Sequence, residues 1–127
     1  MKLLLDTHAA VWATDSPEKL GPLGRQLIED PGNEVLISAI VPWEIAIKMK
    51  AGKMPPHVLV TKFLEVLRDE DFTILQIHPL HAIRAGLLPL YHRDPFDRML
   101  AAQSLELGVP LISADAIFDR YGVQRIW

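Results

Sequence analysis

The sequence contains no cysteine, so disulfide bonds and thiolate metal sites are excluded from both its fold and its chemistry. It also has no apolar run long enough to span a membrane. The first run, Leu3 to Leu5, already ends at Asp6, far short of a signal segment. We therefore expect a soluble, cytoplasmic protein without a membrane partner, and the absence of cysteine fits a reducing compartment.

An excess of positive charge is missing as well. The chain carries 13 Lys and Arg against 16 Asp and Glu, a formal net charge of −3, so there is no general basic face for a nucleic acid. RNA binding would need a local basic cluster, or metal ions that offset the acids. No HExxH motif, P-loop or dinucleotide fingerprint occurs, and we expect structural roles for the histidines.

What is present is a globular composition, with half of the residues apolar and 23% charged. A length of 127 residues predicts a single domain over residues 1–127. A chain of this size buries roughly two-thirds of its unfolded surface, which is enough for a core without disulfides or structural metals.

Short apolar runs alternate with helical patterns along the chain. The expected strands cover residues 3–5, 35–37, 72–77, 110–112 and 123–126. The expected helices cover residues 8–13, 23–30, 39–50 (with Ser38 as N-cap), 58–69, 80–88 and 95–107, with a helical turn over 116–120. This alternation predicts an α/β protein, a three-layer α/β/α sandwich with a parallel sheet, whose site lies at the carboxyl ends of the strands.

Four acids fall at or near those strand ends. Asp6 follows the first strand, Asp115 follows the fourth, Glu44 lies on the helix after the second strand, and Asp97 lies in the first turn of the long helix. Mg²⁺ prefers oxygen ligands and binds through a few carboxylates while it keeps waters for a phosphate substrate. The four acids could therefore form a nuclease centre without histidine or cysteine.

Each acid also has a purely structural interpretation. Asp6 and Asp115 are each placed to cap a following helix, and Glu44 could pair with Lys48 at the surface. Asp94, before Pro95, is a typical helix cap, and Asp97 fits the first turn of the same helix. The apolar neighbours of Glu44 on its helix favour burial. We hypothesise that the four acids together form a site, with Asp94 as the cap.

Basic residues accompany the acids. Lys48 follows Glu44 on its helix, and Arg93 and Arg98 flank Asp97, so these three are candidates for binding an RNA backbone. The alternative for the lysine-rich end of the Glu44 helix is a favourable interaction with the helix dipole.

Four segments together resemble PIN-domain proteins of the VapC toxin group: LLLDTHAAVW, SAIVPWEIAIKMKAGK, LYHRDPFDRMLAAQSLELGVPLISAD and YGVQRIW. The resemblance runs from Met1 to Trp127, and HRDPFDRMLAAQ is its most specific phrase. It implies a parallel α/β/α sandwich and an endoribonuclease that depends on Mg²⁺ or Mn²⁺. It further implies a small VapB-like antitoxin as partner, and a homodimer.

The resemblance also implies roles for individual residues. The four family acids fall on Asp6, Glu44, Asp97 and Asp115, of which Asp6 and Asp97 would be the principal metal ligands. Thr7 and Ser113 match the hydroxyl residues that orient those ligands.

Two other function classes compete with this interpretation. A phosphatase with Asp6 as nucleophile would want a second Asp two residues later, where this sequence has His8. A non-catalytic α/β binding module would use its acids only as helix caps, and a titration with Mn²⁺ distinguishes it from a nuclease.

Overall fold

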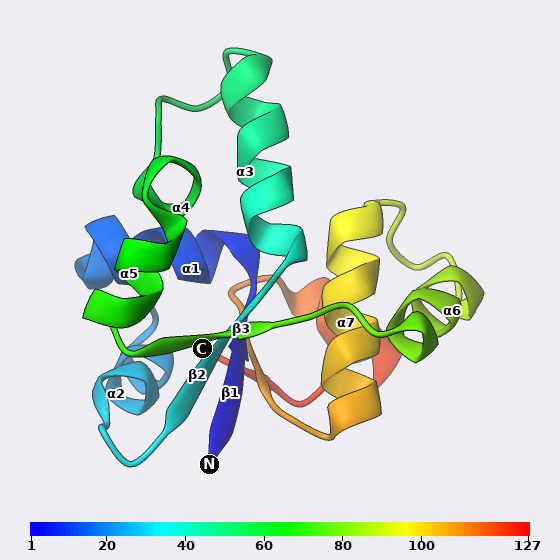
Figure 1. Ribbon diagram of the computed structural model, residues 1–127. Helices are drawn as coiled ribbons and strands as arrows, with labels where there is room; N and C mark the ends of the chain where they lie inside the picture. Colours follow the sequence, from blue (N-terminus) through cyan, green and yellow to red (C-terminus); the bar gives the residue numbers. More distant parts are fainter.

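A computed structural model describes residues 1–127, which form one five-stranded parallel sheet in the order β3-β2-β1-β4-β5 (Figure 1). The strands are β1 (Lys2–Leu5), β2 (Glu34–Ser38), β3 (Phe72–Leu75), β4 (Leu111–Ile112) and β5 (Arg125–Ile126). The central strand β1 buries Leu3, Leu4 and Leu5 completely. Its continuous apolar run follows from this position, since a central parallel strand is covered on both faces.

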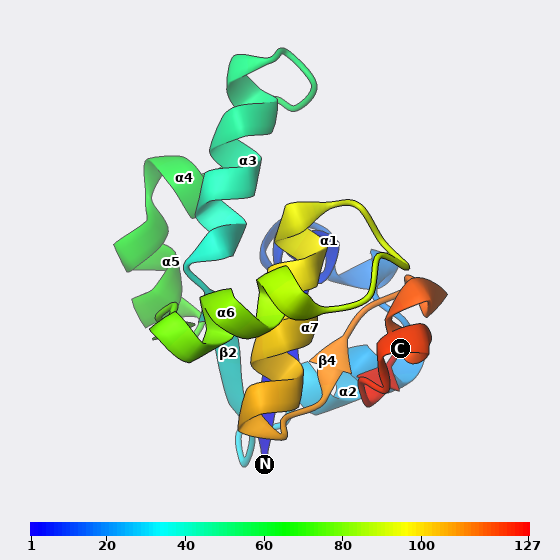
Figure 2. The same ribbon diagram turned by 90° about the vertical axis from the view of Figure 1, so that its right-hand side faces the viewer.

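Helices cover both faces of the sheet, which confirms the three-layer α/β/α sandwich. Figures 1 and 2 show α6 (Pro79–Leu87) and α7 (Pro95–Leu107) on one side, with α1 (Thr7–Asp15), α2 (Pro22–Glu29) and α5 (Phe63–Asp69) on the other. Helix α3 (Ile40–Lys50) extends beyond the sheet and packs against α4 (Val58–Thr61). The short 3-10 helices η1 (Pro17–Lys19) and η2 (Ala116–Tyr121) complete the chain.

The strand order reverses at β1. The chain runs from β1 through β2 to β3 at one edge, and then returns to place β4 and β5 on the other side of β1. In open parallel sheets the crevice at such a switch point, outside the carboxyl ends of the strands, is the usual ligand site. Asp6 and Ser113 follow the two strands that meet there.

Most expected elements are confirmed, with four main differences, of which one is that β5 begins at Arg125 rather than at residue 123. The expected helix over residues 58–69 is broken at Lys62, whose backbone lies at φ −139° and ψ 40°. Its two halves pack on different partners, α4 on α3 and α5 on β3, so one straight helix could not serve both. Strand β3 ends at Leu75 rather than at residue 77. Ala39 is the N-cap of α3, although the Ser38 hydroxyl does accept the Ile40 N–H at 3.2 Å.

None of the helices combines the length and the apolarity that a membrane span requires.

Candidate metal centre

Asp6 lies where β1 ends and α1 begins, and it is only 6% exposed. Its Oδ1 accepts the Ala9 N–H at 2.8 Å, so it is the N-cap of α1. Its Oδ2 accepts the Ser113 hydroxyl at 2.5 Å, across from the end of β4. The cap and the site interpretations therefore hold for the same carboxylate, because each oxygen has a different partner.

Burial raises the pKa of Asp6 above its usual range, and repulsion from Glu44 adds to the rise. The hydrogen bonds from Ser113 and Ala9, and the nearby His8, oppose it. The pKa of this buried carboxylate is raised even though it accepts two hydrogen bonds, so a nearby cation would stabilise its charged form.

Glu44 projects from α3 toward the same end of the sheet and is 5% exposed. Its Oε1 accepts the Thr7 hydroxyl at 2.6 Å, and its Oε2 accepts Lys48 Nζ at 2.7 Å. The i,i+4 pair expected from the sequence is present, but at a buried carboxylate rather than at the surface.

Asp97 has the strongest perturbation, with a pKa raised to about 7. Burial is the main cause, followed by repulsion from Asp94 and then from Glu44 and Asp6, while His92 lowers the pKa. Because Glu44 and Asp6 act on Asp97, three acids far apart in the sequence form one electrostatic cluster.

Asp115 lies at the open side of this cluster, with a side chain that is 53% exposed. Its Oδ1 accepts the Ile117 N–H at 3.0 Å as the N-cap of η2, and its own N–H donates to Ser113 Oγ at 3.0 Å. Its Oδ2 is 3.9 Å from His92 Nε2.

His92 is a member of the centre that the sequence analysis left among the structural histidines. Its Nε2 is 2.8 Å from Asp97 Oδ2, and one ligand atom each from His92, Asp97 and Asp115 lies within 4.8 Å of the others. Its Nδ1 accepts the Asp94 N–H at 3.3 Å, so the ring hydrogen is on Nε2 and points at Asp97. The available signal was its position two residues before Asp94 in the HRDPFD phrase.

Asp94 is the N-cap of α7, as predicted. Its Oδ1 accepts the Phe96 N–H at 2.8 Å and the Asp97 N–H at 3.4 Å. The same carboxylate contributes to the raised pKa of Asp97, although it lies outside the four acids.

The donor set fits a hard divalent cation. It consists of carboxylate oxygens, two of whose parent acids have raised pKa values that a nearby cation would lower. Thr7 and Ser113 donate to one oxygen each of Glu44 and Asp6, which orients these carboxylates. Carboxylate oxygens dominate the set, which suits a hard divalent cation better than a metal that requires several nitrogen ligands.

The expectation that Arg98 binds RNA needs correction. Arg98 is 8% exposed, and its guanidinium donates to backbone carbonyl oxygens in the last turn of α6, at Ala85 and Gly86, and in the connection to α7, at Leu88, Pro89 and His92. Both terminal nitrogens of the guanidinium are thus engaged within the protein. Arg93 and Lys48 remain close to the centre, beside a pocket that both line.

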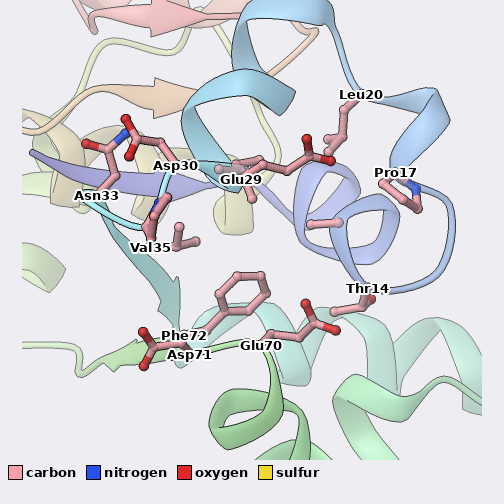
Figure 3. Close-up of a pocket in the computed structure, with 13 residues that line it drawn as sticks. Thr14, Pro17, Leu20, Glu29, Asp30, Asn33, Val35, Glu70, Asp71 and Phe72 are labelled. Carbon is pink, nitrogen blue, oxygen red and sulfur yellow. The ribbon is translucent and has the colours of Figure 1, made fainter.

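A second cavity, of about 470 Å³, lies far from this centre at the amino ends of β2 and β3 (Figure 3). Four acids border it, Glu29, Asp30, Glu70 and Asp71, and no basic side chain does. None of the candidate site residues lines it.

By its fold and its site, the protein is a parallel α/β/α sandwich with an acidic, metal-type centre at the switch point of its sheet. Comparison with known sequences then defines the family: the family model of the PIN domain matches residues 3–124. The chain belongs to the PIN-domain family.

Among individual proteins, the chain is 31% identical over 114 residues to Ribonuclease VapC22 of Mycobacterium tuberculosis, covering 89% of this chain and 86% of that protein. Two solved structures share the fold at low identity. VapBC2 from Rickettsia felis, bound to a DNA fragment from its promoter, matches with a TM-score of 0.68 and 15% identity over 99% of this chain and 98% of that chain. FitAcB from Neisseria gonorrhoeae matches with a TM-score of 0.60 and 19% identity over 98% and 96%.

Proposed function

We propose that this protein is an endoribonuclease of the VapC type, which hydrolyses RNA phosphodiester bonds with a carboxylate-bound Mg²⁺ or Mn²⁺. The observation that carries the proposal is the gathering of Asp6, Glu44, Asp97 and Asp115 at the switch point of the sheet, where burial and three neighbouring acids raise the pKa of Asp97 to about 7. Strongly perturbed carboxylates in a crevice are typical of functional sites. The similarity to Ribonuclease VapC22 supports RNA as the substrate.

We assign Asp6 and Asp97 as the principal metal ligands, with Glu44 and Asp115 completing the coordination directly or through water. Ser113 holds Asp6 by its hydroxyl, and Thr7 holds Glu44 in the same way. When bound, the cation supplies a water of lowered pKa and offsets the charge on the departing 3′ oxygen.

A binding module that uses its acids only as caps is the second candidate. The caps do exist at Asp6, Asp94 and Asp115. Glu44 and Asp97 cap no helix, however; Glu44 is buried and Asp97 is partly buried at the switch point. This burial favours the nuclease.

The test is RNA cleavage that EDTA abolishes and Mg²⁺ or Mn²⁺ restores. Asp6→Asn keeps the shape and the cap of the side chain but loses its charge, so we expect activity to fall more than about 100-fold, since even outer-shell partners of metal sites cost 10–100-fold. Asp30→Asn, in the distant acidic cavity, is the matched control and should retain activity. Full activity of Asp6→Asn would refute the metal-site assignment.

We further propose a small VapB-like antitoxin as partner, by analogy with the VapBC assemblies that share the fold. Large apolar side chains are exposed on the outer helices, among them Leu64 at 78% and Leu87 at 80%. A partner that covers such side chains would remove them from water, which favours association. Co-expression with the product of an adjacent small reading frame should give a stoichiometric complex without nuclease activity.

A further inference from the structure

A pocket of about 460 Å³ adjoins the acidic centre and shares Glu44 with it. One wall is formed by Ile47 and Lys48 of α3, with its C-cap Ala51 and then Lys53 just beyond the helix. The other wall is formed by residues 93–96, where α7 begins. The volume is within the usual range for small-ligand pockets.

The rim of this pocket is basic although the chain as a whole is acidic. Lys48 is bound to Glu44, but neither Lys53 nor Arg93 forms an ion pair. Both are exposed. Two unpaired cations beside a cluster of acids are placed to bind an anion that reaches into that cluster.

The pocket also has an aromatic edge. Phe96 lines it, and Trp43 packs against Phe96 in an edge-to-face arrangement with ring centroids 5.2 Å apart. Trp43 is nevertheless 59% exposed, whereas the other two tryptophans, Trp12 and Trp127, pack against each other. An exposed indole next to unpaired cations is the combination that single-stranded nucleic acids bind, through stacking and phosphate contacts.

We propose that this pocket binds an unpaired nucleotide of the RNA next to the scissile phosphate, with its base against Trp43 and Phe96 and its phosphate at Lys53 and Arg93. The proposal rests on the proposed nuclease function and adds to it the residues that hold the nucleotide, because a base stacked inside a duplex has no free face to offer them. An acidic segment of a partner protein has the same charge, and the experiment below distinguishes it.

The binding of the nucleotide is measured in EDTA, where no cleavage occurs, by the tryptophan fluorescence of the chain titrated with a short oligouridylate. We expect the single strand to quench the fluorescence and its duplex with oligoadenylate to bind more weakly. Trp43→Ala should weaken binding roughly 5- to 100-fold, as loss of one stacked base does. Trp43→Phe should retain most of the affinity, and the binding of both Trp43 variants is followed with a fluorescent label on the RNA, because both lack the reporting indole.

The two cations are tested through salt dependence. Arg93→Gln and Lys53→Gln should each flatten the plot of log K against log salt by about 0.7, the value for one phosphate contact on a single strand. Lys19→Gln, an exposed lysine on η1, is the charge control, and Leu64→Ala is the control for loss of an exposed apolar side chain. All variants are checked by thermal melting.

The proposal would be overturned if Trp43→Ala bound RNA with the affinity of the wild type and if Arg93→Gln and Lys53→Gln kept its salt slope. Variants that lose only the binding of a purified antitoxin and still bind RNA normally would also overturn it. If the wild type cleaves RNA with Mn²⁺ while the pocket variants match it in binding and rate, the pocket assignment alone is wrong. If the wild type with Mn²⁺ cleaves no RNA, the nuclease function itself is wrong.

Discussion

At the scale of single residues, the acids of the centre combine a structural and a chemical role. One oxygen of Asp6 caps α1 while the other meets Ser113, and Asp115 caps η2 with one oxygen while the other faces His92. A carboxylate has two oxygens with separate lone pairs, so the two roles do not compete. The same carboxylate can therefore be both a helix cap and a metal ligand, and the two assignments made from the sequence do not exclude each other.

Asp94 and Asp97 lie three residues apart, but each has only one of these roles: Asp94 caps α7, and Asp97 belongs to the acidic centre. We expect Asp94→Ala to lose about 1 kcal/mol of stability, the typical value of an N-cap, because the Phe96 and Asp97 N–H groups lose their acceptor. It should keep most of the activity. Asp97→Asn should abolish cleavage with little loss of stability, since it removes a charge that is already unfavourable.

Melting curves and cleavage rates of both variants in saturating Mn²⁺ check this pair. A stable but inactive Asp94→Ala protein would place Asp94 in the centre and contradict its assignment as a cap only.

At the scale of elements, the connection between α6 and α7 depends on Arg98. Its guanidinium collects the carbonyl groups that end α6 and those that lead to His92, including Ala85 at 2.8 Å and Leu88 at 3.0 Å. The planar fork of arginine reaches several acceptors at once, which the single ammonium of lysine cannot do. The position of His92 and Asp94 beside the centre therefore depends on a residue that touches neither metal nor substrate.

We expect Arg98→Lys to destabilise the fold by about 2–3 kcal/mol, the range for hydrogen bonds to a charged group. The salt dependence of RNA binding should not change, because the guanidinium already points into the protein. Urea unfolding and salt titrations of the variant measure the two effects. If the variant unfolds at the same urea concentration as the wild type but its RNA binding depends less on salt, Arg98 is an RNA-binding residue after all.

The elements themselves were largely predictable from sequence, because apolar runs and cap residues act locally. Pro95 after Asp94 marked the start of α7, and Gly108 its end. The break at Lys62 was not predictable, since it arises from α4 and α5 packing on different partners. The partners of Arg98 and His92 were hidden for the same reason: loop carbonyls and ring tautomers are set by tertiary structure.

At the scale of the whole molecule, the strand order collects the four acids from across the chain. Adjacent strands β1 and β4 bring Asp6 and Asp115 to one edge, while α3 and α7, which contact each other, bring Glu44 and Asp97. The set of acids was predictable because each member follows a strand or lies near the start of a helix that begins at that edge. Their degree of burial, which determines the pKa of Asp97, was not.

The stability of the whole protein should depend on pH through this cluster. The pKa of Asp97 rises from 3.8 to about 7 on folding, so between these values the folded protein holds a proton that the unfolded chain has lost. This retained proton contributes to the free energy of unfolding. The contribution is fully present below about pH 4 and is lost as the pH rises through 7. Without metal, the melting temperature should therefore fall from pH 5 to pH 8.

Mn²⁺ should reverse this trend, because carboxylate ligands must lose their protons to bind it. The rise in melting temperature on adding Mn²⁺ should be large at pH 8 and small at pH 5, and Asp97→Asn should flatten both dependences. An equal rise at the two pH values would contradict a clustered site.

The hydrogen bond from Ser113 to Asp6 joins residues that are 107 positions apart. A ribosome adds about 5–20 residues per second, so these two groups are synthesised roughly 5 to 20 seconds apart. During that interval Asp6 has neither its hydroxyl donor nor the neighbouring strand β4, and Asp97 and Asp115 are themselves late in the chain. A nascent chain thus carries an incomplete centre until β4 and Ser113 emerge, and the translation machinery that makes the enzyme is not exposed to its activity before that point.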